Sequence, residues 1–236
     1  MLSKNEIKEI KALGQKKFRD QRALFVVEGE KLVEEALRSD FEVVGHWRSE
    51  EIGEDTMARI SQLSHPSPAL AVVRQRKSDG LPPVPGELYL ALDGVRDPGN
   101  LGTILRIADW FGVRRVLASE DTVECYNPKV VQATMGAIFR VAVQYCDLAA
   151  TLHAAAAAGL PVYGTFLDGE TLSQAPLSPG GIVVMGSEAN GISPAVAAAV
   201  GRKLFIPPFP GDRPTSESLN VAVAAALTLS EFRRRG

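Results

Sequence analysis

The sequence predicts an α/β fold, in which a small N-terminal α/β unit precedes a larger domain built on a mostly parallel sheet. Three observations support this class. Short apolar runs alternate with amphipathic segments along the 236 residues. Two apolar runs near the C-terminus end in polar, glycine-bearing loops, and one stretch rich in proline and glycine divides the alternation into two parts. Strands that alternate with helices usually pair in parallel and are covered on both faces.

The smaller unit is expected over residues 1–80. A helix is predicted over residues 3–13, because Ser3 is a suitable N-cap and apolar residues recur on one helix face. Strands are then predicted over 24–29, 42–48 and 69–75, with helices over 30–39 and 54–64. Residues 81–87 are expected to be a linker, since the stretch RKSDGLPPVPGE has the composition of an interdomain connection.

The larger domain is expected over residues 88–236. Its predicted strands are 88–95, 113–119, 139–145, 161–167, 182–185 and 203–206, and its predicted helices are 98–112, 127–137, 148–159 and 221–232. The last two strands end in polar loops that carry glycine. Because open α/β sheets bind ligands at the carboxyl ends of their strands, these loops are candidates for a site.

Composition excludes several classes of protein. The formal net charge of −2 gives no overall basic field. The longest apolar run, Val221 to Leu229, is far shorter than the roughly 20 residues of a membrane span, and charged residues interrupt the N-terminus where a signal peptide would be apolar. Two cysteines without a CxxC pair and three scattered histidines predict no metal centre. We therefore expect a cytoplasmic protein without a bound metal.

Charge is nevertheless uneven along the chain. Residues 4–22 hold seven basic side chains against three acidic ones. The basic residues are Lys4, Lys8, Lys11, Lys16, Lys17, Arg19 and Arg22. This run is either a solvated helix face or a local surface for nucleic acid, and charge alone does not decide between them.

The first candidate site is the loop DGVRDPGN, residues 93–100, and the helix that follows it. A loop between a strand end and a helix N-terminus offers free N–H groups that favour an anion such as phosphate. Arg106 lies on this helix among apolar neighbours. It either faces a site or lies at the surface with its aliphatic stem over apolar side chains.

Two further candidates lie near the C-terminus. Gly186 and Gly191 bound a turn whose backbone can approach a ligand closely, and Glu188 between them is either solvent-facing or an acceptor at the sheet edge. Ser218 can cap the last helix, while Asn220 has poor helix propensity and so indicates a side-chain role. The chain contains no GxxxxGK[ST], no strand-GxGxxG-helix unit and no GxSxG, which disfavours the usual nucleotide-binding and hydrolase readings.

Taken together and in order, three stretches carry a resemblance. NLGTILRIADWFGV, VVMGSEANGIS and FIPPFPGDRPTSESLNVAVAAAL resemble the three motifs of the SpoU (TrmH) family of RNA ribose 2′-O-methyltransferases, in the SPOUT superfamily. The resemblance covers Glu87 to the C-terminus. The N-terminal part, with LFVVEGEKLVEEAL and SHPSPALAVV, is similar to the small L30e-like RNA-binding domain that many members carry.

The resemblance implies S-adenosylmethionine as methyl donor, RNA as substrate, a C-terminal trefoil knot and a homodimer. By position, the residues that match the catalytic motifs are Asn100, Arg106, Glu188, Ser218 and Asn220. Those that match donor contacts are Gly186, Ile206 and Leu219, with Asn190 and Thr165 beside them. The extra N-terminal domain favours ribosomal over transfer RNA.

One departure from the family pattern is the spacing between Gly211 and Ser218, which is longer than usual and places Arg213 where it can add a phosphate contact. Three alternatives stay open at this point. They are an inactive RNA-binding or ribosome-assembly protein on the same fold, a tRNA 2′-O-methyltransferase, and a small-molecule α/β enzyme with a nucleotide cofactor.

Overall fold

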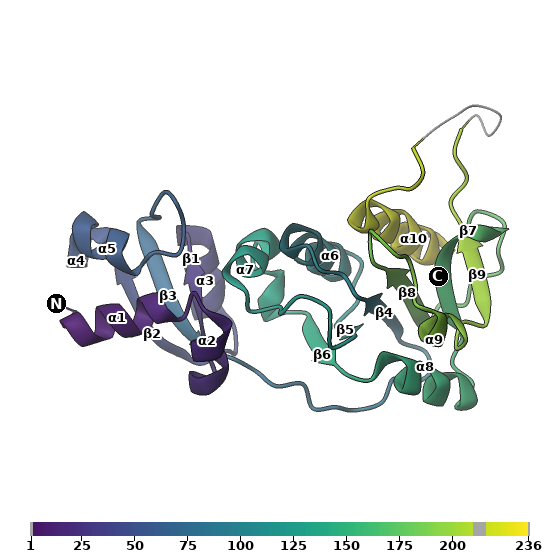
Figure 1. The fold of residues 1–236 in the computed structure, drawn as a ribbon, viewed down its shortest axis with the longest axis horizontal. Helices are drawn as coiled ribbons and strands as arrows, with labels where there is room; N and C mark the ends of the chain where they lie inside the picture. The colour runs from purple at the N-terminus through teal and green to yellow at the C-terminus, as the bar shows by residue number, and fades with distance from the viewer. Residues whose placement is uncertain (1, 210–215, 236) are drawn as a thin grey trace. The chain divides into compact units, whose positions relative to one another are not determined.

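The computed structural model describes residues 2–209 and 216–235, with the side chain of Arg235 excepted. The chain forms two compact units (Figure 1). The first joins the N-terminal residues up to Lys77 with Glu124–Arg140, and the second joins Ser78–Val123 with Val141–Gly236. The segment Glu124–Arg140 therefore packs with the N-terminal unit, although it lies within the range expected for the larger domain.

The first unit is built on a three-stranded antiparallel sheet in the order β1-β3-β2. The strands are β1 (Leu24–Glu28), β2 (Val43–Arg48) and β3 (Ala69–Arg74). The helices are α1 (Lys4–Ala12), α2 (Lys16–Arg22), α3 (Glu30–Arg38), α4 (Ser49–Ile52), α5 (Glu54–Ile60) and α7 (Pro128–Thr134), with a 3₁₀ turn η1 (Ala137–Phe139). The three predicted strands are confirmed, and so are the helices predicted over residues 3–13, 30–39 and 54–64. The short helices α2 and α4 were not predicted.

Apolar side chains from both faces of this sheet build the core. On one face, Val26 and Val72 pack with residues of α1 and α5 such as Ile10 and Ile60. On the other face, the fully buried Phe25 lies 4.5 Å from the ring of Tyr126, measured between centroids. Because that contact and those of η1 bury apolar surface against β1, the segment Glu124–Arg140 belongs to this core.

Local hydrogen bonds explain where the helices of the first unit begin and end. α1 starts after Ser3 in a capping box, in which Ser3 Oγ accepts from the Glu6 N–H at 3.2 Å and Glu6 Oε2 accepts from the Ser3 N–H at 2.7 Å. α5 ends at Ile60, four residues earlier than expected, because the Gln62 N–H donates to the Glu28 carboxylate instead of continuing the helix, and the Ser61 hydroxyl donates to the same carboxylate. α7 ends before Met135, which has a φ of 50° in the left-handed region.

The second unit contains a six-stranded sheet in the order β6-β5-β4-β8-β7-β9, and all five strand pairs are parallel. The strands are β4 (Leu88–Asp93), β5 (Arg115–Ala118), β6 (Ala142–Tyr145), β7 (Val162–Thr171), β8 (Gly181–Gly186) and β9 (Arg202–Phe205). The predicted parallel sheet is confirmed. Central strands β4 and β8 are buried almost throughout, as strands covered on both faces must be.

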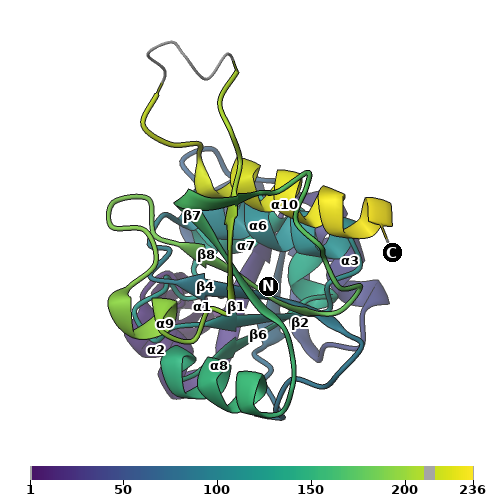
Figure 2. The same cartoon turned by 90° about the vertical axis from the view of Figure 1, so that its right-hand side faces the viewer.

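Helices cover both faces of this sheet (Figure 2). They are α6 (Pro98–Trp110) and α10 (Val221–Arg235) on one face, and α8 (Leu148–Ala157) and α9 (Pro194–Ala197) on the other. α6 and α10 run side by side in the same direction. Their first turns are joined through Asn100 and Asn220, and Arg233 near the end of α10 donates to the Phe111 carbonyl after the end of α6.

Strand β7 is longer than expected because it contains a bulge. Thr165 and Glu170 both lie opposite Leu204 of β9, so the residues between them leave the ladder. Lys203 of β9 lies over the Phe166 ring and forms an ion pair with Asp168. These two contacts hold the bulge of β7 against β9. The bulge follows Thr165 directly, at the carboxyl end of the regular part of the strand.

Candidate functional site

The carboxyl ends of neighbouring parallel strands bring the three motif regions to one edge of the second unit's sheet. β4 leads into the loop before α6, β8 into the Gly186–Gly191 turn, and β9 into the stretch before α10. Side chains separated by up to 120 residues in the sequence meet there. This is the edge at which the sequence placed a site.

A chain of three polar side chains joins the three motifs. Asn100 Nδ2, in the first turn of α6, donates to Glu188 Oε1 at 2.5 Å. Asn220 Nδ2, at the start of α10, donates to Asn100 Oδ1 at 2.9 Å. The structure therefore brings together Asn100, Glu188 and Asn220, one residue from each motif.

Helix α10 determines the orientation of the two side-chain amides, those of Asn220 and Asn100. The backbone N–H groups of Ala222 and Val223 point at Asn220 Oδ1, at 2.9 and 3.4 Å, and a backbone N–H can only donate. Asn220 must therefore present its NH₂ to Asn100, which then presents its own NH₂ to Glu188. Each link fixes the next, so the Glu188 carboxylate is met by an N–H donor of fixed orientation.

The turn that carries Glu188 depends on close backbone contact. A Cβ added to Gly186 would lie 2.2 Å from the carbonyl carbon of Gly191, so only glycine fits at this position. Ser187 and Gly191 form an antiparallel bridge, and the Asn190 N–H donates to Ser187 Oγ at 3.1 Å. Both Glu188 and Asn190 are exposed at the tip of this turn.

Asp93 opens the candidate loop 93–100, but its specific role could not be read from the sequence. It is the last residue of β4, only 8% exposed, and its Oδ2 accepts from the Ser193 N–H at 2.6 Å. This bond ties the end of β4 to the residue that follows the Gly186–Ile192 loop, and so holds that loop against the sheet. The sequence offered no signal beyond an aspartate at a strand end, which turn chemistry also explains.

A second carboxylate supports the loop between β4 and α6. Ser119 Oγ accepts from the Gly94 N–H at 2.8 Å and donates to Asp121 Oδ1 at 2.7 Å, while Arg96 donates to the other oxygen of Asp121 at 3.1 Å. The hydrogen bond from Ser119, followed by that from Arg96, lowers the pKa of the Asp121 carboxyl below its ordinary value. The loop after β5 therefore fixes the loop that leads to Asn100.

Arg106 lies outside this polar chain. Its side chain is exposed, and it forms no hydrogen bond or ion pair with any residue that the structure describes. It lies six residues after Asn100 on α6, about 9 Å along the helix axis. Four residues further on, Trp110 shares its exposed helix face and is itself 85% exposed.

The remaining predicted residues surround the polar chain at the strand ends. Thr165 Oγ1 donates to the Val184 carbonyl at 3.4 Å, and Ile206 directly follows β9 with intermediate exposure. Leu219 is 47% exposed, and Ser218 beside it is exposed and makes no hydrogen bond within the described ranges. Arg213 and the lengthened part of the loop at 211–215 lie outside the described residues.

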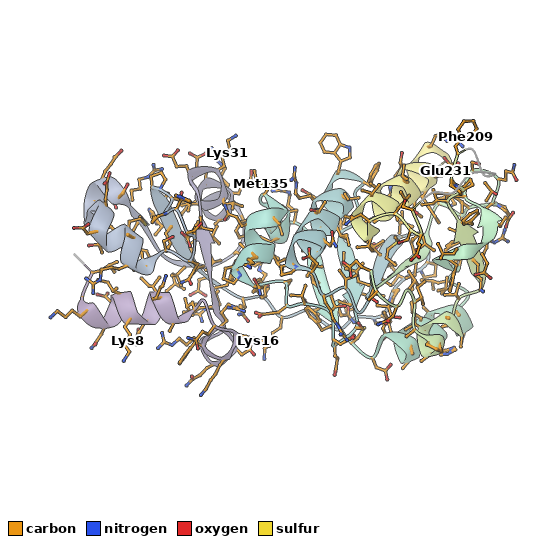
Figure 3. The ribbon with its side chains drawn as sticks, turned by 45° about the horizontal axis from the view of Figure 1, so that its top comes forward. Lys8, Lys16, Lys31, Met135, Phe209 and Glu231 are labelled. Atoms are coloured by element: carbon orange, nitrogen blue, oxygen red, sulfur yellow. The ribbon has the colours of Figure 1, made fainter. Side chains whose placement is uncertain are left out.

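The basic run at residues 4–22 divides into two groups. Arg19 departs from the rest, because its guanidinium is 2% exposed and makes two hydrogen bonds to Glu124, at 2.6 and 3.1 Å. Arg22 and Lys16 form ion pairs with Glu9 and Asp20 at the surface. The other lysines of the run are exposed: Lys4, Lys8, Lys11 and Lys17. Figure 3 shows Lys8 and Lys16 extending from α1 and α2.

Residues 2–209 and 216–235, which the structure describes, lack two kinds of feature. They contain no group of three or more metal-ligating side chains. Nor does any helix among them have the length and apolar character required to cross a membrane. The polar chain at the sheet edge therefore remains the strongest candidate site.

Comparisons with known proteins agree with this geometry. Residues 87–230 match the SpoU rRNA Methylase family, and residues 4–54 match the MRM3-like substrate binding domain. The chain is 31% identical to the 23S rRNA (guanosine(2553)-2′-O)-methyltransferase RlmP of Bacillus subtilis, over 98% of this chain and 97% of that protein. The family match contains all three motifs that meet at the site.

Solved structures give the same result. A TrmH-family protein from Porphyromonas gingivalis has a TM-score of 0.90 at 40% identity, with 100% of both chains covered. An AdoMet-bound rRNA methyltransferase from Sinorhizobium meliloti has a TM-score of 0.88 at 30% identity, covering 100% of this chain and 96% of that one. Because the family match spans more than half of the sequence and RlmP aligns along nearly all of it, the protein belongs to the SpoU rRNA methylase family.

Proposed function

We propose that this protein transfers a methyl group from S-adenosylmethionine to a ribose 2′-hydroxyl in ribosomal RNA. The observation that carries the proposal is the chain Glu188–Asn100–Asn220, which joins the three family motifs at one sheet edge. Arg106 follows on α6 and has no partner among the described residues. The substrate follows from relatives named as 23S rRNA methyltransferases, such as RlmP. We also infer a cytoplasmic location, because the substrate belongs to the ribosome.

The residues at the strand ends fit the methyl donor. Its adenine ring requires apolar contacts on its faces and backbone groups at its edge. Partly exposed Ile206 and Leu219 supply the apolar surface, and the backbone at Gly186 lies in a turn too tight for any side chain. Thr165 and Asn190 lie on the neighbouring strand and turn. When bound there, S-adenosylmethionine supplies an electrophilic methyl group on a sulfonium sulfur.

Arg106 is assigned to the substrate. A guanidinium retains its proton up to a pKa above about 12, which makes it a poor base, but its planar donors suit a phosphate and a developing alkoxide. An exposed arginine without a partner among the described residues is free to take up that role. We therefore propose that Arg106 clamps the substrate phosphate and stabilises the attacking 2′-oxygen.

Proton removal from the 2′-hydroxyl is assigned to oxygen acceptors near the polar chain. Glu188 is oriented by Asn100, and exposed Ser218 lies two residues before Asn220. These two side chains and the substrate phosphate are the candidates for accepting the proton. The main contribution of the protein is alignment, since an in-line displacement depends on holding the oxygen and the methyl carbon at attack distance.

The exposed face of α6 and α10 supports a homodimer. Trp110 is 85% exposed on α6, and Val223 and Leu227 are 49% and 45% exposed one turn apart on α10. Because α6 and α10 are adjacent and parallel, these apolar side chains suit a second copy of the same chain. Arg106 lies on the same face as Trp110, so the partner would approach the site. We also propose the C-terminal trefoil knot of the family around this site.

The domain assignment is part of the same proposal. Residues 1–80 are assigned to RNA selection, 81–87 to the linker and 88–236 to methyl transfer. Exposed Lys4, Lys8 and Lys17 support RNA contact by the first unit, which matches a substrate binding domain. A local basic surface is sufficient for RNA even when the net charge of the chain is slightly negative.

The central test is methyl transfer by the full chain. The protein is incubated with labelled S-adenosylmethionine and with rRNA or tRNA in separate reactions, and the RNA is digested to nucleosides. Label in a 2′-O-methylnucleoside from rRNA is expected. Label only from tRNA would identify a tRNA enzyme, and no label with intact RNA binding would identify an inactive assembly protein.

Arg106→Ala tests the assignment of roles within the site. Methyl transfer is expected to fall by about a hundredfold to a thousandfold, by analogy with the loss of a transition-state donor, while the affinity for S-adenosylmethionine by calorimetry stays near that of the wild type. Arg114→Ala is the matched control, because Arg114 is also an exposed arginine of the second unit. A large loss of donor affinity in Arg106→Ala would contradict the proposed division of labour.

A further inference from the structure

The first unit contains a pocket of about 320 Å³, which is within the range of ligand-binding pockets. It is lined by residues from two distant parts of the chain: Gln62, Leu63, Pro128, Lys129, Gln132 and Ala133. The first two follow α5, and the other four belong to α7. All six residues lie in the first unit, so the pocket is formed within one compact body.

The wall that follows α5 is held in place by a buried carboxylate. Glu28, at the end of β1, is 4% exposed and accepts from the Gln62 N–H at 2.5 Å and from Ser61 Oγ at 2.6 Å. Gln62 Nε2 donates in turn to carbonyls of α1, among them that of Lys11 at 3.2 Å. These bonds give the wall a defined shape before any ligand arrives.

The opposite wall, from α7, presents unused polar groups. Gln132 Nε2 lies 4.0 Å from the position that a Cβ at Gly29 would occupy, next to Glu28. Within the described part of the chain, the Gln132 amide forms no hydrogen bond, and the ammonium group of Lys129 forms no ion pair. Together with Leu63, Pro128 and Ala133, the pocket combines an apolar surface with one free amide and one free cation.

A row of lysines leads to this pocket along α1. Lys4, Lys8 and Lys11 are spaced by four and three residues, so they lie on one face of the helix. Lys11 Nζ donates to the Ser61 carbonyl, directly before the pocket residue Gln62. The basic row therefore ends at the pocket wall, and Lys129 continues the positive charge on the opposite side.

We propose that this pocket holds one unstacked base of the RNA substrate, with the neighbouring phosphates along Lys129 and the α1 lysines. The inference rests on the proposed function for the identity of the ligand as RNA. Single-stranded RNA is recognised by taking up splayed bases against apolar side chains and by hydrogen bonds to their edges. Here Leu63, Pro128 and Ala133 contact the faces of the base, and the Gln132 amide reads its edge.

The charge pattern favours RNA over an acidic peptide. A row of phosphates repeats along a strand and matches lysines that repeat along a helix face, whereas a base needs a flat apolar slot with an amide beside it. α7 lies within the span of the methylase family match and yet packs with the substrate-binding unit. Both walls of the pocket would then move as one body when RNA binds.

Photochemical cross-linking locates the base directly. The full-length protein is irradiated with a short single-stranded RNA that carries one 4-thiouridine, and the modified peptides are identified by mass spectrometry. Cross-links at 62–63 or 128–133 are expected, and an excess of the same RNA without the label should remove them. Cross-links confined to the second unit would overturn the proposal.

Charge-matched variants test the affinity. Lys129→Glu is expected to weaken binding of the same single-stranded RNA about tenfold or more by fluorescence anisotropy, at one fixed salt concentration. Lys31→Glu makes the same change of charge at an exposed residue of α3, outside the lining of the pocket, and should weaken binding much less. Equal losses of RNA affinity in the two variants would show that only the overall charge of the protein matters. That result would overturn the proposed base-binding pocket.

Filling the pocket gives an independent test that leaves charge unchanged. Ala133→Leu places a larger side chain in the apolar slot on α7, and about tenfold weaker RNA binding is expected with unchanged donor affinity. Thermal unfolding verifies that the variant is folded; if it is not, Gln132→Ala replaces it. RNA binding and methyl transfer at wild-type levels in Ala133→Leu would refute the pocket and leave the proposed function standing. A wild-type protein that methylates no RNA would refute the proposed function instead.

Discussion

Asn220 uses its two amide atoms for two different purposes. Its oxygen caps α10 by accepting from Ala222 and Val223, and its NH₂ donates to Asn100. The two purposes are separable by substitution. Asn220→Asp keeps an oxygen for the cap but removes the donor, whereas Asn220→Ala removes both.

We expect Asn220→Asp to unfold near the wild-type temperature and yet to lose most methyl transfer. Without its donor, Asn100 is free to turn, and Glu188 no longer meets a fixed NH₂. Asn220→Ala should lose activity and also about 1 kcal/mol of stability through the missing cap. Thermal unfolding and initial methyl-transfer rates measure both effects. Wild-type activity in Asn220→Asp would show that the amide chain does not orient the site.

Single residues of the site could be predicted from the sequence to different degrees. Glu188, Asn100 and Asn220 were predicted because each lies in a motif, and their contact, which the structure shows, follows from parallel strands that end at one edge. Asp93 was included in the candidate loop 93–100, but its role could not be predicted, because its bond joins two residues 100 positions apart and its type is common at strand ends. The sequence placed Arg106 on the helix. Only the structure shows that it has no partner among the described residues.

Elements of the first unit show what local patterns can and cannot predict. The capping box at Ser3 is a sequence signature, and α1 begins where it predicts. The early end of α5 is not a local property, since it depends on Glu28 in another element. The place of α7 is even less local. Its apolar spacing predicts a helix, but that spacing does not show which surface the helix packs on. The contact with β1 depends on residues far away in the sequence, such as Phe25.

The ion pair between Arg19 and Glu124 ties α2 to the segment that contains α7. Arg19 is 2% exposed, so the loss of Glu124 would leave a buried cation without a counter-ion, held only by its hydrogen bond to the Leu13 carbonyl. We expect Glu124→Gln to lower the free energy of unfolding by about 3 kcal/mol, measured by urea denaturation. The double variant Arg19→Leu/Glu124→Leu should recover much of that loss, because no charge remains buried. Equal losses in the single and double variants would contradict this account.

Tyr126 makes the same segment sensitive to alkaline pH. Its hydroxyl donates to the Arg76 carbonyl and accepts from the Arg76 N–H, both at 3.0 Å, and burial raises the pKa of the phenol above its ordinary value of 10. Below about pH 10 both folded and unfolded chains keep this proton, so stability does not depend on it. At higher pH the unfolded chain releases the proton first, and stability falls by up to about 1.4 kcal/mol per pH unit.

Tyr126→Phe isolates this contribution. At neutral pH the variant should be less stable than the wild type by about 1 kcal/mol, because the hydrogen bonds to Arg76 are lost. Above about pH 10 the difference should shrink, since only the wild type has the ionising phenol. Urea midpoints for both proteins between pH 8 and pH 11, a range set around the ordinary phenol pKa, measure the trend. A constant difference across that range would contradict the burial of the hydroxyl.

At the scale of the whole molecule, the two compact units do not follow the order of the chain. The sequence predicts a boundary near residue 81, but Glu124–Arg140 packs with the first unit. Deleting the N-terminal residues would remove β1, whose Phe25 contacts Tyr126 and Phe139. The apolar surface of these two side chains would then be exposed. The role of the first unit in RNA selection is therefore better tested by surface substitutions such as Lys129→Glu than by truncation.

The proposed homodimer predicts that a charge on the exposed apolar face of α6 and α10 weakens self-association. An aspartate in place of Trp110 would bury a charge in the apolar face of α6 and α10, which is costly without a partner. We expect Trp110→Asp to weaken self-association at least about 100-fold, equivalent to about 2.7 kcal/mol, measured by sedimentation velocity across a concentration series. Leu37→Asp is the control, because Leu37 is 48% exposed on α3 of the other unit. Since Arg106 shares the face of Trp110, methyl transfer should fall together with dimer content and recover at high protein concentration. A wild-type protein that sediments as a monomer while it methylates RNA would show that one copy completes the site alone.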